Sequence, residues 1–362
     1  MKQMTDRSKI IVAIDSFKGC LTSREANQAA VSGILQGNPD AEVVQVPVSD
    51  GGEGWLEAFH AAWGGELVDV SVSDPLMRPV VAQYLTKGDT AVIEMARASG
   101  LTLLLPEECN PLAATSYGTG QLVVDAVRRG CRRLVVGLGG SATSDCGIGM
   151  LRAVIDSFAT DGHWDDVHAL DDVGVTIATD VTTPLCGKHG AAHVFAPQKG
   201  ATPEMVTKLE ARARQFAEKS ARHFGYDRQD YPGAGAAGGL GYAFLQYMNA
   251  DCRPGIDLLL EAVRFDALLQ GADLVITGEG SADRQTLMGK LPFGILRRAK
   301  DCQVPVALMA GRVSDRQLLL DAGFSRVECI NPPGLPIAEA MNPERARRNI
   351  RDTIHRLVSV ML

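Results

Sequence analysis

Runs of consecutive apolar residues that end in glycine or in acidic residues recur along the chain. Six of them predict buried strands: residues 9–15, 41–48, 134–138, 274–280, 305–310 and 327–330. Because apolar residues occupy successive positions in these runs, both faces of each strand are expected to be covered, as in a parallel sheet. A further apolar run at 175–179 predicts another strand.

Helical patterns alternate with these strands. Thr22 or Ser23 can cap a helix that continues to Leu35, and further helices are predicted from Trp55 and from Gly149. Three longer segments complete the set: residues 115–130, 203–223 and 343–361. Alternation of strand and helix along a chain is typical of α/β proteins.

The alternation is interrupted twice, which predicts two domains. Segments 1–65, 115–155 and 255–362 are expected to form a flavodoxin/Rossmann-like doubly wound parallel sheet. Segments 66–114 and 160–254 are less regular and predict a second α/β domain inserted into the first, with a cleft between them. Within the insertion, short strands are expected at 66–84 and 90–95, and a short strand and turn at 193–200.

Composition narrows the function classes. The chain has 362 residues, 46% hydrophobic and 22% charged, as in globular proteins of two ordinary domains. A net charge of −7 disfavours nucleic-acid binding. No apolar segment predicts a signal peptide or a membrane span, and the eight cysteines and seven histidines form no metal-ligand spacing. A cytoplasmic protein with reduced thiols and no structural metal is expected; a homo-oligomer is compatible with the sequence.

The loop that follows the strand 134–138 is rich in small residues. Its candidate anion-binding residues are Gly139, Gly140, Ser141, Thr143 and Asp145. Glycines allow a ligand to approach the backbone, and the N–H groups at the start of the following helix favour an anion. The same residues would also suit a well-capped turn without any ligand.

Polar side chains also follow the other predicted parallel strands. The exits of these strands carry Asp15, Ser16 and Lys18, then Asp50, Gly51 and Gly52, then Gly278, Glu279, Asp283 and Lys290. Ligands of open α/β sheets bind at the carboxyl ends of the strands, so these groups predict a site there. Lysines at that edge suit a phosphate group as point charges.

Two aspartates are candidates for acid–base chemistry or for Mg²⁺. Asp180 follows the strand 175–179 directly, and Asp283 follows the strand 274–280 closely. Either carboxylate could accept a proton from a substrate hydroxyl or bind Mg²⁺. Either could instead cap a helix.

Known nucleotide-binding motifs do not account for this pattern. A G-x-G-x-x-G sequence begins at Gly233, but no strand precedes it, so its context is wrong for a dinucleotide. The chain also lacks the P-loop pattern G-x-x-x-x-G-K-[ST].

Taken together, the glycine-rich and acidic segments resemble the bacterial glycerate kinase family of the two-domain type. The matching segments run in order along nearly the whole chain: 15–19, 46–54, 93–96, 115–120, 137–143, 179–182, 195–200, 232–239 and 277–280. The resemblance implies a flavodoxin-like domain with an inserted domain. It also implies transfer of a phosphoryl group from ATP, with Mg²⁺, to a hydroxyl of D-glycerate, giving 2-phosphoglycerate.

We expect direct in-line transfer, in which domain closure excludes water. Lys18, Asp180 and Asp283 are the expected catalytic residues; one aspartate is the base and the other binds Mg²⁺. The nucleotide is assigned to residues 139–145, Gly278, Glu279 and Lys290, and the substrate to Asp15, Ser16 and residues 50–52.

Two other functions stay open at this point. Ser144, Cys146, Thr183 and Ser281 depart from the family pattern. These substitutions are compatible with another small hydroxy acid as substrate, or with a non-catalytic sensor of an organic acid or nucleotide. A nicotinamide-dependent dehydrogenase would suit the doubly wound sheet, but residues 15–19 lack its glycine fingerprint.

Overall fold

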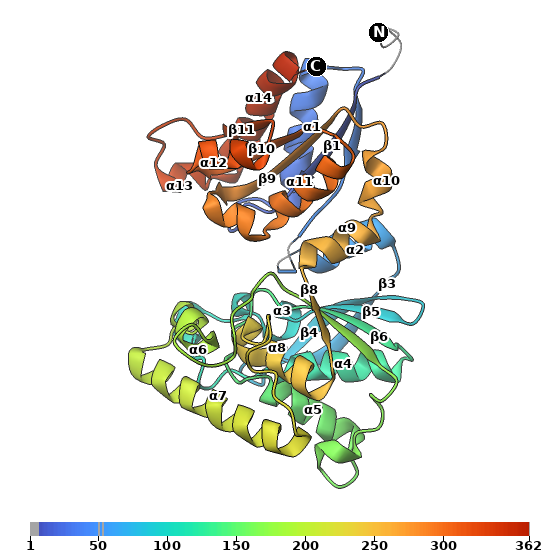
Figure 1. The fold of residues 1–362 in the computed structure, drawn as a ribbon, viewed down its shortest axis with the longest axis vertical. Coiled ribbons are helices and arrows are strands. Elements are labelled where there is room, and N and C mark those ends of the chain that lie inside the picture. The colour runs from blue at the N-terminus through green and yellow to red at the C-terminus, as the bar shows by residue number, and fades with distance from the viewer. Residues whose placement is uncertain (1–6, 50, 53, 362) are drawn as a thin grey trace. The chain divides into compact units, whose positions relative to one another are not determined.

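The computed structural model describes residues 7–49, 51–52 and 54–361, which form two compact units (Figure 1). Unit 1 combines residues 1–50, 57–63 and 256–362, and unit 2 combines residues 51–56 and 64–255. Unit 2 is thus inserted in the chain between two parts of unit 1. Among the described residues, no helix has the length and apolar character needed to cross a membrane.

Unit 1 is built on a parallel sheet of five strands. These are β1 (Lys9–Ile14), β2 (Glu42–Gln45), β9 (Leu274–Ala282), β10 (Val306–Val313) and β11 (Arg326–Cys329). Their order across the sheet is β2-β1-β9-β10-β11, the arrangement of flavodoxin. The predicted fold class is therefore confirmed, and the point where the strand order reverses lies between β1 and β9, where Ile14 is paired with Gly278.

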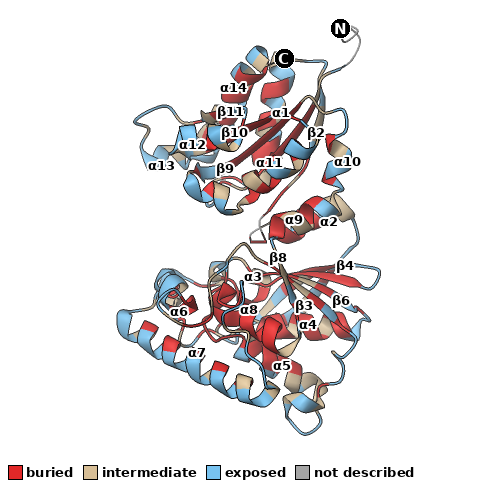
Figure 2. Ribbon diagram, viewed as in Figure 1, coloured by how far each residue is buried: buried red, intermediate tan, exposed pale blue. Residues whose placement is uncertain are grey.

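The helices of unit 1 are α1 (Ser23–Gly37), α10 (Phe265–Leu269), α11 (Leu291–Asp301), α12 (Arg316–Ala322), α13 (Ile337–Ala340) and α14 (Pro343–Met361). Most of α2 (Trp55–Trp63) and most of α9 (Gly255–Ala262) also belong to this unit. A 3₁₀ turn, η5 (Arg284–Met288), follows β9. One face of β1, which carries Ile10, Val12 and Ile14, packs with α1 and α14 in one apolar cluster. The three central strands β1, β9 and β10 are buried along most of their length, whereas the edge strands β2 and β11 are not (Figure 2).

Unit 2 contains a mixed sheet of six strands in the order β3-β4-β5-β6-β7-β8. The strands are β3 (Glu66–Ser73), β4 (Pro79–Lys87), β5 (Thr90–Glu94), β6 (Arg133–Gly137), β7 (Gly174–Ala178) and β8 (Asp251–Arg253). β4 is antiparallel to both of its neighbours, and the pairs from β5 to β8 are parallel.

The helices of unit 2 are α3 (Ala96–Ser99), α4 (Tyr117–Arg128), α5 (Ile148–Phe158), α6 (Ala191–Phe195), α7 (Pro203–Phe224) and α8 (Ala236–Tyr247). Four 3₁₀ turns complete the unit: η1 (Leu101–Leu103), η2 (Pro106–Glu108), η3 (Trp164–Asp166) and η4 (Pro197–Lys199). The sheet and these helices other than α6 share a large apolar core that includes Ile93, Val136 and Ile177.

Two expectations about these elements were wrong. Segment 115–155 was expected in the sheet with residues 1–65, but β6 pairs with β5 and β7, so this segment belongs to unit 2. The apolar composition of a strand predicts that the strand is buried, but it does not predict which strands pair with it. Segment 193–200 was expected as a strand and turn, but it is the end of α6 followed by η4, because Ala192 and Ala196 pack on α7.

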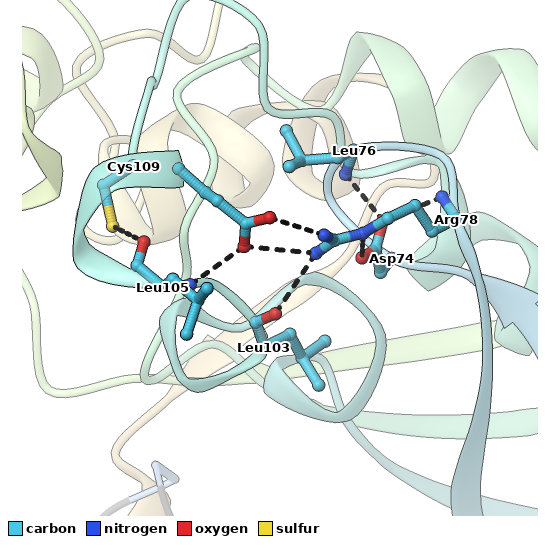
Figure 3. Close-up of polar contacts among 7 residues, drawn as sticks. Asp74, Leu76, Arg78, Leu103, Leu105 and Cys109 are labelled. Atoms are coloured by element: carbon cyan, nitrogen blue, oxygen red, sulfur yellow. Dashed lines mark hydrogen bonds and ion pairs between the residues drawn. The ribbon is translucent and has the colours of Figure 1, made fainter.

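One arginine ties the first hairpin of unit 2 to the segment that follows its third strand (Figure 3). Arg78, in the turn between β3 and β4, donates its Nε proton to Asp74 at 2.6 Å and an Nη proton to Glu108 at 2.6 Å. Asp74 also accepts the N–H groups of Leu76 and Arg78. These hydrogen bonds hold the pKa of Asp74 below its usual range, although burial acts in the opposite direction.

Candidate functional site

A cavity of about 440 Å³ lies in unit 1 at the carboxyl ends of β1, β9 and β10. This is the edge of a parallel sheet, next to its reversal of strand order, where ligands of such folds bind. Five of the predicted site residues line the cavity: Asp15, Ser16, Lys18, Glu279 and Lys290. The structure therefore brings these five residues together, and their individual roles stay predictions.

The first wall of the cavity is the turn after β1. The N–H of Asp15 extends the sheet by donating to the carbonyl of Gly278 at 2.9 Å. Phe17 and Leu21 are buried and exchange backbone hydrogen bonds, which closes a tight turn. Gly19 occupies this turn with a φ of 71°, a value that favours glycine. The turn consequently presents Lys18 as an exposed cation at the mouth of the cavity.

The second wall consists of the carboxyl-terminal part of β9 and the turn after it, and it contains a buried acid. Glu279 is 7% exposed; its Oε1 accepts the hydroxyl proton of Thr286 at 2.6 Å, and its Oε2 lies 3.7 Å from Nζ of Lys290. Burial raises the pKa of Glu279, while Thr286 and Lys290 act in the opposite direction. The turn that carries Thr286 and Lys290 is therefore folded onto this carboxyl group.

The third wall is the carboxyl-terminal end of β10, which adds a cation that sequence reasoning missed. Arg312 lines the cavity beside Gly311, whose carbonyl accepts an amide proton of Asn331 at 2.8 Å. Asn331 in turn accepts a proton from Asn349 at 2.9 Å, so this corner is braced from α14. Arg312 follows the predicted strand 305–310 by two residues, and the rule applied to the other strand exits could have found it.

The charges in the cavity favour an anionic ligand. Of the described residues that line it, Lys18, Lys290 and Arg312 are cationic, whereas Asp15 and Glu279 are acidic. Three cations against two carboxylates leave a cationic excess at this edge of the sheet. Such a cavity can hold phosphate or carboxylate oxygens.

Four of the predicted site glycines gather in unit 2, whereas Gly278 lies on β9 in unit 1. Gly139 donates its N–H to the carbonyl of Gly51 at 3.1 Å, and a Cβ atom on Gly139 would lie 2.3 Å from Cα of Gly52. Gly140 has a φ of 74° and stands at the bend that follows. The structure thus brings the predicted substrate glycines Gly51 and Gly52 against the predicted phosphate loop, and close backbone packing explains why they are small.

Hydrogen bonds to the carboxylate of Asp145 stabilise this loop. Its carboxylate accepts the N–H and the hydroxyl proton of Ser116, both at 2.8 Å, and the N–H groups of Gly147 and Gly149, both at 3.1 Å. The N–H groups of the next residues, Ile148 and Met150, are paired as well. The protein itself therefore satisfies the N–H donors at the start of α5, which disfavours an anion bound to these particular groups.

A buried lysine supports the same loop from the other side. Lys199 is 3% exposed and donates to the hydroxyl of Ser141 at 2.7 Å and to the carbonyl of Thr143 at 2.6 Å. Burial lowers the pKa of Lys199 to about 7, and the charge of Asp145 opposes this shift. Sequence reasoning did not single out Lys199; its only signal was a place in the family-like segment 195–200.

The two aspartates predicted as base and metal ligand lie in different units. Asp283 is the N-cap of η5, where its Oδ1 accepts the N–H of Gln285 at 2.7 Å, so its structural role is confirmed. Asp180 follows β7 in unit 2 and is half-buried. Asp50 lies outside the described residues. Among the residues that are described, no group of three or more His, Cys, Asp or Glu side chains could hold a metal ion.

A flavodoxin-like sheet with a cationic cavity at its reversal point is typical of α/β enzymes that bind nucleotides or other small anions. The chain belongs to the glycerate kinase family, whose model matches residues 10–362.

Individual relatives agree with this family membership. The chain is 41% identical to a glycerate kinase of Bacillus subtilis (strain 168), with 95% of this chain and 96% of that protein covered. It is 38% identical to a glycerate 2-kinase of Escherichia coli (strain K12), with 96% and 98% covered. A crystal structure from Salmonella typhimurium LT2 that carries the description glycerate kinase 2 is 36% identical, covers 97% of both chains and has a TM-score of 0.78.

Proposed function

We propose that this protein transfers the terminal phosphoryl group of ATP to a hydroxyl group of D-glycerate, giving 2-phosphoglycerate. The observation that carries the proposal is the cavity of unit 1, where Lys18, Lys290 and Arg312 meet at the carboxyl edge of the sheet. The names of the relatives support glycerate as the substrate, and one of them supports position 2.

The cations of the cavity would bind the phosphate chain and stabilise the charge of the transferring group. Phosphoryl transfer needs mainly positioning and electrostatic stabilisation, because the enzyme forms no covalent bond in direct in-line transfer. Lys18 sits on a turn that its neighbours hold closed, so its amine needs little reorganisation to reach a phosphate. We assign it the largest catalytic effect of the three cations.

Mg²⁺ fits the carboxylates of this cavity. Magnesium sites in such enzymes use one or two carboxylates together with the phosphates of the nucleotide. Asp15 and Glu279 lie near the carboxyl ends of the adjacent strands β1 and β9 and line the cavity, so they would supply these oxygens. When bound, the ion neutralises phosphate charge. Asp180 stays the proposed base for the substrate hydroxyl, whereas the capping bond of Asp283 supports a structural role.

A coupled assay of ADP formation tests the proposal. D-glycerate, L-glycerate and related sugar acids are compared as acceptors, and phosphorus NMR identifies the position of the phosphate in the product. ADP formation that requires D-glycerate and yields the 2-phosphate is expected. A preference for another hydroxy acid would support the divergent substrate that the substitutions at Ser144 and Ser281 allow. Binding of ATP without transfer to any acceptor would support the sensor.

The oxidation state of the cysteines bears on the cellular compartment of the protein. All eight cysteines are free in the structure. Reduced thiols in this number support our proposal of a cytoplasmic location, since disulfides persist in oxidising compartments.

A further inference from the structure

The cavity of unit 1 has an apolar side as well as a cationic side. Ile330, Ile337, Ala340 and Met341 line it, and we call these four residues the apolar wall. Ile337 is 81% exposed and Met341 is 41% exposed, so these two side chains of the wall, unlike Ile330, are not buried in the core of unit 1. Large apolar side chains exposed at the rim of a cavity often mark a binding surface.

The wall is held in place by its own backbone. After β11, the N–H of Ile330 donates to the carbonyl of Ala310 at 2.9 Å, which fixes the start of the segment. The carbonyl of Pro336 accepts the N–H groups of Glu339 and Ala340, and that of Ile337 accepts the N–H of Met341. These bonds form α13, so the segment presents its apolar side chains from a short helix.

The apolar wall is continuous with the cationic side. A Cβ atom on Gly19 would lie 3.4 Å from Cε of Met341, so the methionine reaches the turn that carries Lys18. One ligand could therefore contact the wall and the cations together. The volume of about 440 Å³ falls within the range of nucleotide-sized sites and exceeds what a three-carbon acid needs.

We propose that the apolar wall binds the purine ring of the nucleotide, with the phosphates directed toward Lys18, Lys290 and Arg312. This inference rests on the proposed kinase function and assigns a subsite within it. A purine has flat apolar faces that gain from contact with aliphatic side chains, whereas glycerate is polar at every carbon. Methionine is well suited to such a ring, since its thioether is flexible and contacts aromatic groups favourably.

The test compares two ligands that share the phosphates and differ in the base. Calorimetry measures ADP and pyrophosphate binding to the full chain, with Mg²⁺, for the wild type and the double variant I337S/M341S. The double variant is expected to bind ADP about tenfold more weakly or worse, because two apolar contacts are lost. Its affinity for pyrophosphate is expected to stay within about twofold, because the cations are unchanged.

Two further variants control for indirect effects. V360S removes an apolar side chain that is 74% exposed on α14, outside the cavity lining, and should leave both affinities unchanged. I337W places an indole on the wall, and ADP, but not pyrophosphate, should quench its fluorescence. Thermal unfolding of each variant establishes that it is folded.

The outcomes separate the subsite from the function. Wild-type ADP affinity in I337S/M341S would overturn the purine subsite while leaving the kinase proposal intact. Equal weakening of ADP and pyrophosphate would also overturn it, since the wall would then only shape the cavity. If the wild type bound ADP no more tightly than pyrophosphate, the result would contradict both the purine subsite and the use of ATP.

Discussion

Replacing Lys199 by methionine is expected to change how the stability of the protein depends on pH. Burial lowers the pKa of this amine from 10.5 to about 7 in the folded state. Below pH 7 the folded and unfolded chains both carry the proton, and the folded state bears the full cost of the buried charge. Between pH 7 and 10.5 only the unfolded chain keeps the proton, so stability rises with pH.

The size of the effect follows from this difference. Each pH unit inside the window adds about 1.4 kcal/mol to the free energy of unfolding. From about pH 7.5 to 9.5, the wild type should therefore gain about 2–3 kcal/mol relative to K199M. The neutral amine keeps two N–H donors, which matches its two acceptors, Ser141 and Thr143.

Urea unfolding followed by tryptophan fluorescence, repeated across this range, measures the difference. Buried thiols such as Cys146 act in the opposite direction, because burial raises the pKa of this thiol, but they are common to both proteins and cancel. K208M removes an exposed lysine of α7 and serves as the matched control. If wild type and K199M differ by a constant amount at every pH, the reasoning about the buried amine is refuted.

Three other substitutions separate catalytic from structural roles. K18A should lower kcat of ADP formation by about 100-fold and stability by less than about 0.5 kcal/mol, because Lys18 is exposed at the cavity; a similar kcat would remove it from the mechanism. D145A should lower the free energy of unfolding by about 3 kcal/mol in urea, because buried donors lose their acceptor; a loss below about 1 kcal/mol would contradict this role. D283N should keep kcat within about threefold, because asparagine caps nearly as well; a fall of about 100-fold would instead identify Asp283 as the base.

Most of the cavity was predictable because it follows from the geometry of a parallel sheet. Carboxyl ends of parallel strands meet at one edge, so the residues after β1 and β9 had to lie together once both segments were recognised as strands of one sheet. Asp15, Lys18 and Glu279 are within four residues of those strand ends. Their place needed no knowledge of side-chain packing.

The errors arose where long-range contacts decide the outcome. β6 is as apolar as β1, and only its pairing with β5 and β7 assigns it to unit 2. Lys199 has the composition of any surface lysine, and its burial depends on Ser141 and Thr143, more than fifty residues away in the chain. The helical structure of 193–200 could not be predicted because it depends on Ala192 and Ala196 packing on α7, a contact that the local sequence does not show.

The insertion of unit 2 between β2 and β9 sets an order for biosynthesis. β1 must wait for β9, as the hydrogen bond from Thr277 to Ala13 spans 264 residues, whereas the strands of unit 2 come from one continuous stretch. During translation the inserted unit can therefore complete its sheet while β1, which is apolar apart from Lys9, still lacks β9. Chaperones that cover exposed strands would be needed most in that interval.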